Sequence, residues 1–156
     1  MTKEELREIA EELCALIPYG VKLNTPYGDY DLVSVDFEGG AEHPCLWGSQ
    51  GGDMLHTGQD FDIESDHTLP YLRSLESLTD DELEEMKPLL SPEGTAKYYR
   101  DGIHGPMTHF GTYVPYEYME RIVRHLRSMK VDVRGLIGRG LAVPAPDGMY
   151  WKEAGV

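Results

Sequence analysis

The sequence predicts an α+β fold in which a small, mainly antiparallel sheet is packed by an N-terminal helix and a C-terminal-region helix, with a short helix between. Apolar residues recur at helical spacing near both ends of the chain, β-type composition with partial alternation covers residues 21–37, and a glycine-rich middle carries short strand-like segments. The length of 156 residues predicts a single domain, 1–156.

The N-terminal helix has a start signal, an apolar stripe and a stop signal. Thr2 and Glu5 form a capping box, and Pro18 and Gly20 end the pattern. The stripe comprises Leu6, Ile9, Ala10, Leu13, Leu16 and Ile17, with Cys14 expected as a small core residue near its edge.

The strands are expected after this helix. Residues 21–23 and 30–37 predict a β-hairpin around the turn-prone segment 24–29. Shorter strand-like pieces lie at 45–47 and 61–63, and residues 69–75 read as an extended segment.

Two further helices follow. A second capping box, Thr79 with Glu82, predicts a short helix from Asp80 to about Lys87. From Pro115 a third helix places apolar side chains on one side and arginines on the other, and a short element is expected around residues 135–139.

Charge is distributed unevenly along the chain. Residues 1–120 contain 25 acidic and 7 basic residues, whereas residues 121–156 contain 3 and 7, which gives about −18 and +4 and sums to the formal −14. A surface this acidic repels the phosphate groups of DNA and RNA, which argues against direct nucleic-acid binding. No apolar stretch is long enough to cross a membrane, and the first residues do not form a secretory signal, so we expect a cytoplasmic protein.

Several groups of residues are candidates for chemistry. Imidazole, thiolate and carboxylate ligands could come from His43, Cys45 and Asp53, or from His104 and His109, but these spacings match no established metal motif. Alternation of Asp60, Asp62, Glu64 and Asp66 would place four carboxylates on one strand face. We predict no catalytic residue, metal or cofactor, with a metal-assisted hydrolase as the alternative.

The basic C-terminal segment is the predicted partner-binding surface. Arginine and aromatic residues are typical of interface hot spots, and the candidates are Arg121, Arg124, Arg127, Arg134, Tyr150 and Trp151. One alternative is that Arg127, Lys130, Arg134 and Arg139 cover the acidic body of the same protein, while Arg121 and Arg124 pair with Glu117 and Glu120 one turn earlier. Another is that a small phosphorylated ligand binds near Arg134 and Tyr150, although Gly135, Gly138 and Gly140 do not form a nucleotide-binding motif. A protein partner is predicted, and homo-oligomerisation is left open.

Three segments carry a resemblance to a known family. They are Ile17 to Val21, Pro70 to Glu84, and Val131 to Tyr150 with its Arg134-Gly-Leu-Ile137 and Gly140-Leu-Ala142 motifs. Together they resemble an uncharacterised family of small acidic proteins from gut Bacteroidales phages and prophages. The resemblance implies a phage or mobile-element accessory protein acting in the bacterial cytoplasm, and it carries over no catalytic residue. The uneven charge, the ten tyrosines and the lack of catalytic patterns predict a non-enzymatic binding protein, and in a phage setting the expected partner is a host defence or regulatory protein.

Overall fold

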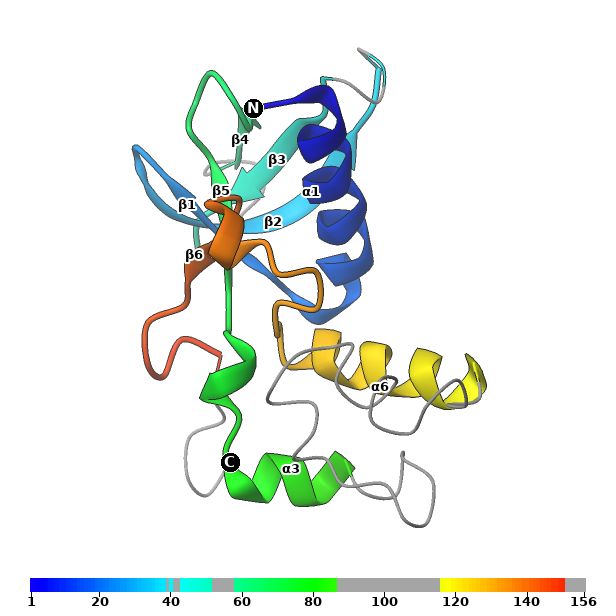
Figure 1. The fold of residues 1–156 in the computed structure, drawn as a ribbon. Helices are drawn as coiled ribbons and strands as arrows, with labels where there is room; N and C mark the ends of the chain where they lie inside the picture. The colour runs from blue at the N-terminus through cyan, green and yellow to red at the C-terminus, as the bar shows by residue number, and fades with distance from the viewer. Residues whose placement is uncertain (39, 41–42, 52–57, 87–115, 151–156) are drawn as a thin grey trace. The chain divides into compact units, whose positions relative to one another are not determined.

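The fold is α+β, as the sequence predicts (Figure 1). The computed structural model describes residues 1–38, 40, 43–51, 58–86 and 116–150, with the backbone alone for 116–119. Its main elements are α1 (Lys3–Leu16), β1 (Lys22–Thr25), β2 (Gly28–Asp36), β3 (Cys45–Ser49), β4 (Gly58–Asp62), β5 (Leu69–Leu72), α3 (Asp80–Met86), α6 (Tyr116–Ser128) and β6 (Val143–Pro144). Short 3-10 turns occupy Ile17–Tyr19, Leu75–Ser77 and Ile137–Arg139.

The chain divides into two compact units. The first, which we call the sheet unit, comprises Met1–Leu72 and Leu136–Ala145, and the second, the helical unit, comprises Arg73–Gly135 and Pro146–Val156. The chain therefore passes from one unit to the other at residues 72–73, 135–136 and 145–146. That both units fold together as one domain stays a prediction.

The sheet unit contains one mixed sheet with the strand order β4-β3-β2-β1-β5-β6. Neighbouring strands are antiparallel from β4 through β5, whereas β6 runs parallel to β5, with Tyr71 opposite Val143. The predicted hairpin is present, and the two remaining strand-like pieces of the middle region are β3 and β4. No sequence pattern indicates β6, which is only two residues long.

The β1–β2 hairpin turns within two residues, which is tighter than the expected segment 24–29. The Thr25 hydroxyl donates to the carbonyl of Gly28 at 2.7 Å and accepts from the N–H of Tyr27 at 3.1 Å. Gly28 has a φ of +117°, which a residue with a Cβ adopts only with strain. These local contacts fix the register that places Leu23 opposite Tyr30.

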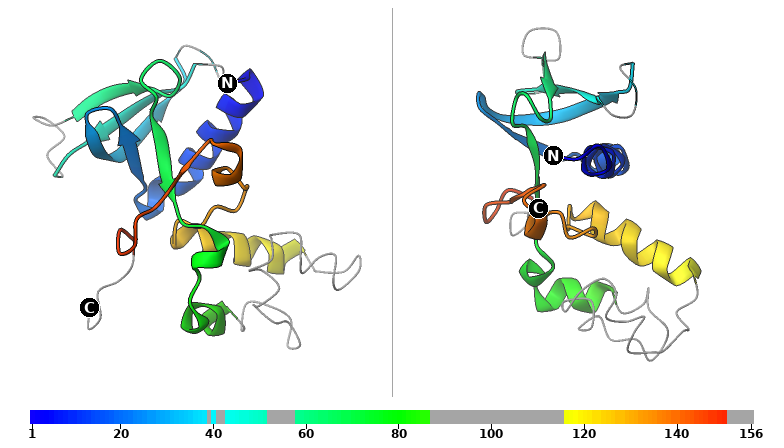
Figure 2. Two further views of the ribbon diagram at one scale, coloured as in Figure 1. Left: turned by 60° about the vertical axis from the view of Figure 1, so that its left-hand side comes forward. Right: turned by 45° about the horizontal axis from the view of Figure 1, so that its top comes forward.

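Helix α1 lies on one face of the sheet (Figure 2). It begins with the predicted capping box, in which the Thr2 N–H donates to Glu5 at 2.7 Å and the Glu5 N–H donates to the Thr2 hydroxyl at 3.1 Å. Its apolar stripe packs against strand residues in one core: Leu6, Ile9, Leu13, Leu16, Val21, Leu23, Tyr30, Leu32, Leu46, Phe61, Ile63, Leu72, Leu136, Leu141 and Ala142. One expectation is corrected, because Cys14 is exposed and does not join this core. The helix also buries the polar residue Glu12, which is 1% exposed.

Gly48 allows two strands to pack closely in this core. The Tyr30 and Phe61 rings meet edge to face with centroids 4.8 Å apart. A Cβ at position 48 would lie 3.1 Å from Phe61 Cε2 and 3.1 Å from Tyr30 Cβ. A Cβ here would force Phe61 or Tyr30 to shift by a few tenths of an ångström, so space rather than backbone conformation favours glycine.

The helical unit has its own core around α3 and α6. Its buried residues are Leu78, Leu83, Met86, Ile122, Leu126, Val131 and Val133, so the described apolar side of α6 packs here. The predicted capping box of α3 is present, since the Thr79 N–H donates to Glu82 at 3.1 Å and the Glu82 N–H donates to the Thr79 hydroxyl at 3.2 Å. None of the helices that the structure describes is both long and apolar enough to span a bilayer.

Candidate functional site

The predicted partner-binding arginines lie on α6 and beyond it. Arg121 and Arg124 are exposed and Arg127 is half-buried, and their spacing of three residues places them along one side of the helix. We call these three residues the arginine strip. Arg134 is also exposed but follows the helix, and Trp151 lies outside the described residues.

Helix α6 ends in a Schellman motif with lysine at the position where glycine is usual. The Lys130 N–H donates to the carbonyl of Arg127 at 2.9 Å, and the Val131 N–H donates to that of Leu126 at 3.0 Å. Lys130 accordingly has a φ of +58°. Its ammonium lies 5.4 Å from the centre of the Tyr150 ring, so Tyr150 joins this helix end.

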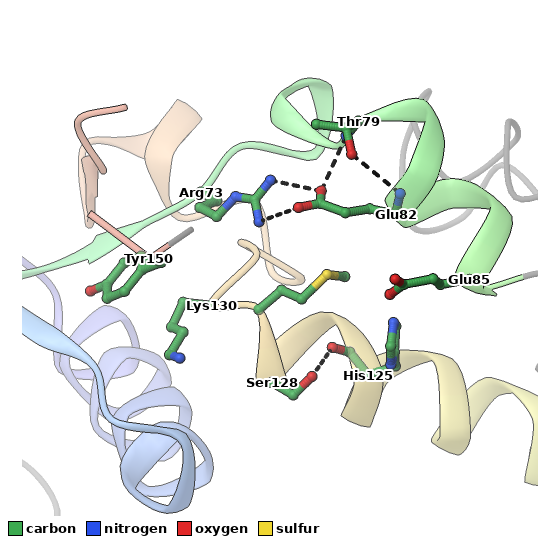
Figure 3. A pocket seen from close by; sticks show the side chains of 9 residues that line it. Arg73, Thr79, Glu82, Glu85, His125, Ser128, Lys130 and Tyr150 are labelled. Carbon is green, nitrogen blue, oxygen red and sulfur yellow. Dashed lines mark hydrogen bonds and ion pairs between the residues drawn. The ribbon is translucent and has the colours of Figure 1, made fainter. Parts of the chain in front are cut away.

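A pocket of about 670 Å³ lies in the helical unit next to Lys130. Figure 3 shows its lining side chains, which come from the segment after β5, from α3, from the end of α6 and from Tyr150. They are Arg73, Thr79, Glu82, Glu85, His125, Ser128, Met129, Lys130 and Tyr150. Of these, sequence reasoning proposed only Tyr150 as a binding residue.

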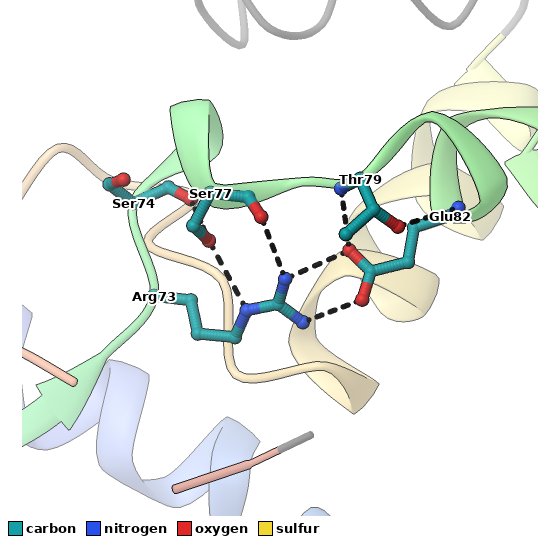
Figure 4. Close-up of polar contacts among 5 residues, drawn as sticks. All are labelled: Arg73, Ser74, Ser77, Thr79 and Glu82. Atoms are coloured by element: carbon teal, nitrogen blue, oxygen red, sulfur yellow. Dashed lines mark hydrogen bonds and ion pairs between the residues drawn. The ribbon is translucent and has the colours of Figure 1, made fainter. Parts of the chain in front are cut away.

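One wall of the pocket is a closed polar network around Arg73 (Figure 4). The Arg73 guanidinium donates to both carboxylate oxygens of Glu82, at 3.1 and 2.8 Å, and to the hydroxyl and carbonyl of Ser77, at 3.2 and 3.1 Å. The side chain of Arg73 is 4% exposed and that of Glu82 is 23% exposed. Because Glu82 also completes the α3 cap, this network joins the start of α3 to Arg73, the first residue of the helical unit.

The charges in the pocket perturb each other. Burial alone would raise the pKa of Glu82, but hydrogen bonds from Arg73 and from the Thr79 N–H outweigh it and lower that pKa, with further help from the charge of Arg73. Burial lowers the pKa of Lys130, because its ammonium has lost part of its hydration.

His125 has a polar atom in the pocket that no described residue satisfies. Its Nε2 is buried and has no hydrogen-bond partner within the part of the chain that the structure describes. The ring points toward Glu85 on α3 (Figure 3), while the Ser128 hydroxyl donates to the main-chain carbonyl of His125 at 2.6 Å.

The residues proposed for hydrolytic chemistry do not form a site in the described structure. Cys45 on β3 contacts Asp60 on β4, with its Sγ 3.6 Å from Oδ1. Burial, then the charge of Asp60, raises the pKa of the Cys45 thiol and so disfavours the nucleophilic thiolate. His43 is exposed, and Asp53, His104 and His109 fall outside the described residues. Among the residues described, no three His, Cys, Asp or Glu side chains are grouped as metal ligands.

The expected ladder of carboxylates from Asp60 to Asp66 is wrong. Strand β4 ends at Asp62, and Glu64 and Asp66 lie in the turn that follows. Asp62 accepts from the N–H and the hydroxyl of Ser65, both at 2.7 Å, and its own N–H donates to Asp66 at 2.7 Å. The hydroxyl bond from Ser65 is the main reason that the pKa of Asp62 is lowered, so these carboxylates hold a turn together.

The alternative that the cations cover the acidic body is met at Arg139. Arg139 donates to Glu8 of α1 at 2.6 Å, in the sheet unit. Arg124, in contrast, pairs with Glu120 one turn earlier at 3.1 Å, and its side chain is 64% exposed. Internal neutralisation therefore accounts for Arg139 but leaves the Arg124 guanidinium accessible.

The pocket was missed because its parts are distant in sequence. A partial signal existed, since Glu82 and Glu85 on α3, and His125 and Ser128 on α6, are each spaced i to i+3 and so share a helix side. Nothing in the sequence indicates that these two sides line a common space.

Comparisons with family models, with curated proteins and with solved structures gave no match to this chain.

Proposed function

We propose that this chain is a non-enzymatic binding protein whose arginine strip docks onto an acidic surface of a partner protein. In the setting that the family resemblance suggests, it is an accessory protein of a phage or mobile element, acting in the bacterial cytoplasm on a host defence or regulatory protein. The observation that carries the proposal is the exposure of Arg121 and Arg124 in a chain with a net charge of −14.

Arginine at these positions suits reversible docking. An exposed pair such as Arg124 with Glu120 contributes only about 0–1 kcal/mol, so exchanging Glu120 for a partner's carboxylate costs little. The planar guanidinium can then bind that carboxylate through two parallel hydrogen bonds. The acidic remainder of the chain repels nucleic acid, which favours a protein carboxylate as the ligand.

The test compares two variants of equal charge change. Arg121→Gln with Arg124→Gln removes two exposed cations from the arginine strip, and Lys3→Gln with Arg7→Gln removes two exposed cations from α1. Immobilised wild-type protein and both variants are incubated with Bacteroidales lysate, and retained proteins are quantified by mass spectrometry against a charge-matched unrelated protein.

The proposal expects one or a few proteins that wild type and the α1 variant retain equally and that the strip variant loses at least tenfold. Circular dichroism checks that both variants are folded. Equal retention by the two variants, or no protein above the control, would refute docking through the strip.

The pocket favours the second candidate function, binding of a small ligand near Tyr150. Its volume of about 670 Å³ lies within the range of small-molecule sites. A phosphorylated ligand is the version that the sequence suggested, and its test is a shift in melting temperature with inorganic phosphate and nucleotides. An unchanged melting temperature would remove that version.

A further inference from the structure

We propose that the pocket of the helical unit binds a small zwitterion, such as an amino acid or ω-amino acid, with its carboxylate at Lys130 and its ammonium at Glu85 and His125. This site is separate from the arginine strip, and the inference does not depend on a protein partner. The proposed ligand carries both a positive and a negative charge, whereas the phosphorylated ligand considered above carries only negative charge.

Several polar lining groups are already used by the fold. Arg73 and Glu82 bind each other through two hydrogen bonds, and Arg73 also donates twice to Ser77. Thr79 and Glu82 complete the cap of α3, and the Ser128 hydroxyl donates to a main-chain carbonyl. These groups shape the pocket, and a ligand could recruit them only by breaking a formed contact.

Among the described lining residues, Lys130, His125 and Glu85 are polar groups outside these contacts. The ammonium of Lys130 is partly dehydrated and packs over Tyr150, so a carboxylate would replace hydration that it has lost. At the other side of the view in Figure 3, His125 and Glu85 approach each other from α6 and α3. A donor between them would satisfy the buried His125 Nε2 and gain a charge-assisted hydrogen bond to Glu85.

The balance of charge favours a zwitterion over an anion or a metal ion. The Arg73–Glu82 pair is neutral as a unit, which leaves one cation, Lys130, and one anion, Glu85, among the lining groups. A dianionic phosphate would find one lysine and would be repelled by Glu85. A divalent metal would need oxygen and nitrogen ligands grouped around one point, and no such group is present among the described residues.

Isothermal titration with simple probes tests the two-ended recognition. The zwitterions are glycine, γ-aminobutyrate and ε-aminocaproate, which differ in the separation of their charges. The matched single-charge compounds are caproate, which lacks the ammonium, and hexylamine, which lacks the carboxylate. The expectation is that at least one zwitterion binds wild-type protein with a dissociation constant below about 1 mM and at least tenfold tighter than both single-charge compounds.

Variants locate the binding. Lys130→Met keeps the length of the side chain without its charge, and Glu85→Gln removes the negative charge of an exposed side chain. Each is expected to weaken binding of the best zwitterion at least tenfold, while Arg124→Gln in the arginine strip leaves it within twofold. The proposal is overturned if no zwitterion binds, if caproate or hexylamine binds equally well, or if both pocket variants retain wild-type affinity.

Discussion

Replacing Glu82 by glutamine tests whether the Arg73 network holds the helical unit together. The substitution removes the negative charge that two guanidinium hydrogen bonds approach, at 3.1 and 2.8 Å, but keeps an oxygen that can accept from the Thr79 N–H. The cap of α3 is thus largely retained. What is lost is the ionic part of the contact with Arg73.

The expected loss of unfolding free energy is about 2 kcal/mol. Removing one partner of a fully buried ion pair costs about 3–5 kcal/mol, and a hydrogen bond to a charged group contributes about 1.5–3 kcal/mol. Arg73 meets the condition of burial at 4% exposure, whereas Glu82 at 23% keeps some contact with water, which places the cost toward the lower end. The control is Glu120→Gln, because the Glu120–Arg124 pair is 55% and 64% exposed and contributes less than about 1 kcal/mol.

Urea unfolding followed by far-ultraviolet circular dichroism at pH 7 gives both free energies. A loss for Glu82→Gln that equals the loss for Glu120→Gln would refute the structural role of the network. The same measurement at lower pH tests the direction of the pKa shift of Glu82. Because the pKa of Glu82 is lowered below its usual 4.5 in the folded protein, the unfolded chain takes up the proton first on acidification.

The contribution of Glu82 to stability is therefore complete above about pH 6, declines as the pH falls below about 5, and is lost once the pH passes the folded-state pKa. Glutamine does not titrate. The difference in unfolding free energy between wild type and Glu82→Gln should accordingly be constant above pH 6 and shrink below pH 5. A difference that grows on acidification would contradict the assigned direction of the shift.

Three other substitutions have clear expected outcomes in the same urea assay. Gly48→Ala should lower the free energy of unfolding by about 1–3 kcal/mol, because the added Cβ would lie 3.1 Å from Phe61. The control is Gly138→Ala, which should leave the free energy of unfolding unchanged, because a Cβ there would have no atom within 4 Å. Equal effects of the two substitutions would refute the packing argument. Thr2→Ala should cost about 1 kcal/mol through loss of the capping box, and an unchanged midpoint would show that the cap is dispensable. Lys130→Gly should raise the free energy of unfolding by about 0.5–1 kcal/mol, because glycine adopts a φ of +58° without strain. A lower free energy of unfolding would mean that contacts of the lysine side chain stabilise the fold by more than the backbone strain costs.

The parts of the fold that the sequence predicts are those specified by neighbouring residues. Both capping boxes depend on residues three apart, and the hairpin depends on a short turn, so a short stretch of sequence is enough to predict each of them. Strand β6 is specified instead by its parallel pairing with β5, which is about seventy residues earlier in the chain. Strand β6 consists of Val143 and Pro144, and two residues are too few to show the alternation that predicts a strand.

Misplaced site residues have a similar explanation. Alternation from Asp60 to Asp66 suggests one strand face, but the side chain of Asp62 caps a turn by bonding Ser65, and a local side-chain bond of this kind ends the strand. Arg73 was not recognised as a pocket residue because its partner Glu82 is nine residues away, across a 3-10 turn, and because His125 reaches the same space from α6. Spacing within one helix predicts which residues share a side, and only packing decides what that side meets.

Two departures from favourable local structure coincide at the pocket of the helical unit. A Schellman motif favours glycine, yet position 130 is lysine in the left-handed region, at a cost of about 1–2 kcal/mol. Buried polar atoms are usually hydrogen-bonded, yet His125 Nε2 has no partner among the described residues. Because strained and unsatisfied groups gather where a protein binds its ligands, the coincidence of a lysine and a histidine at one pocket favours a binding role for it over a defect of packing.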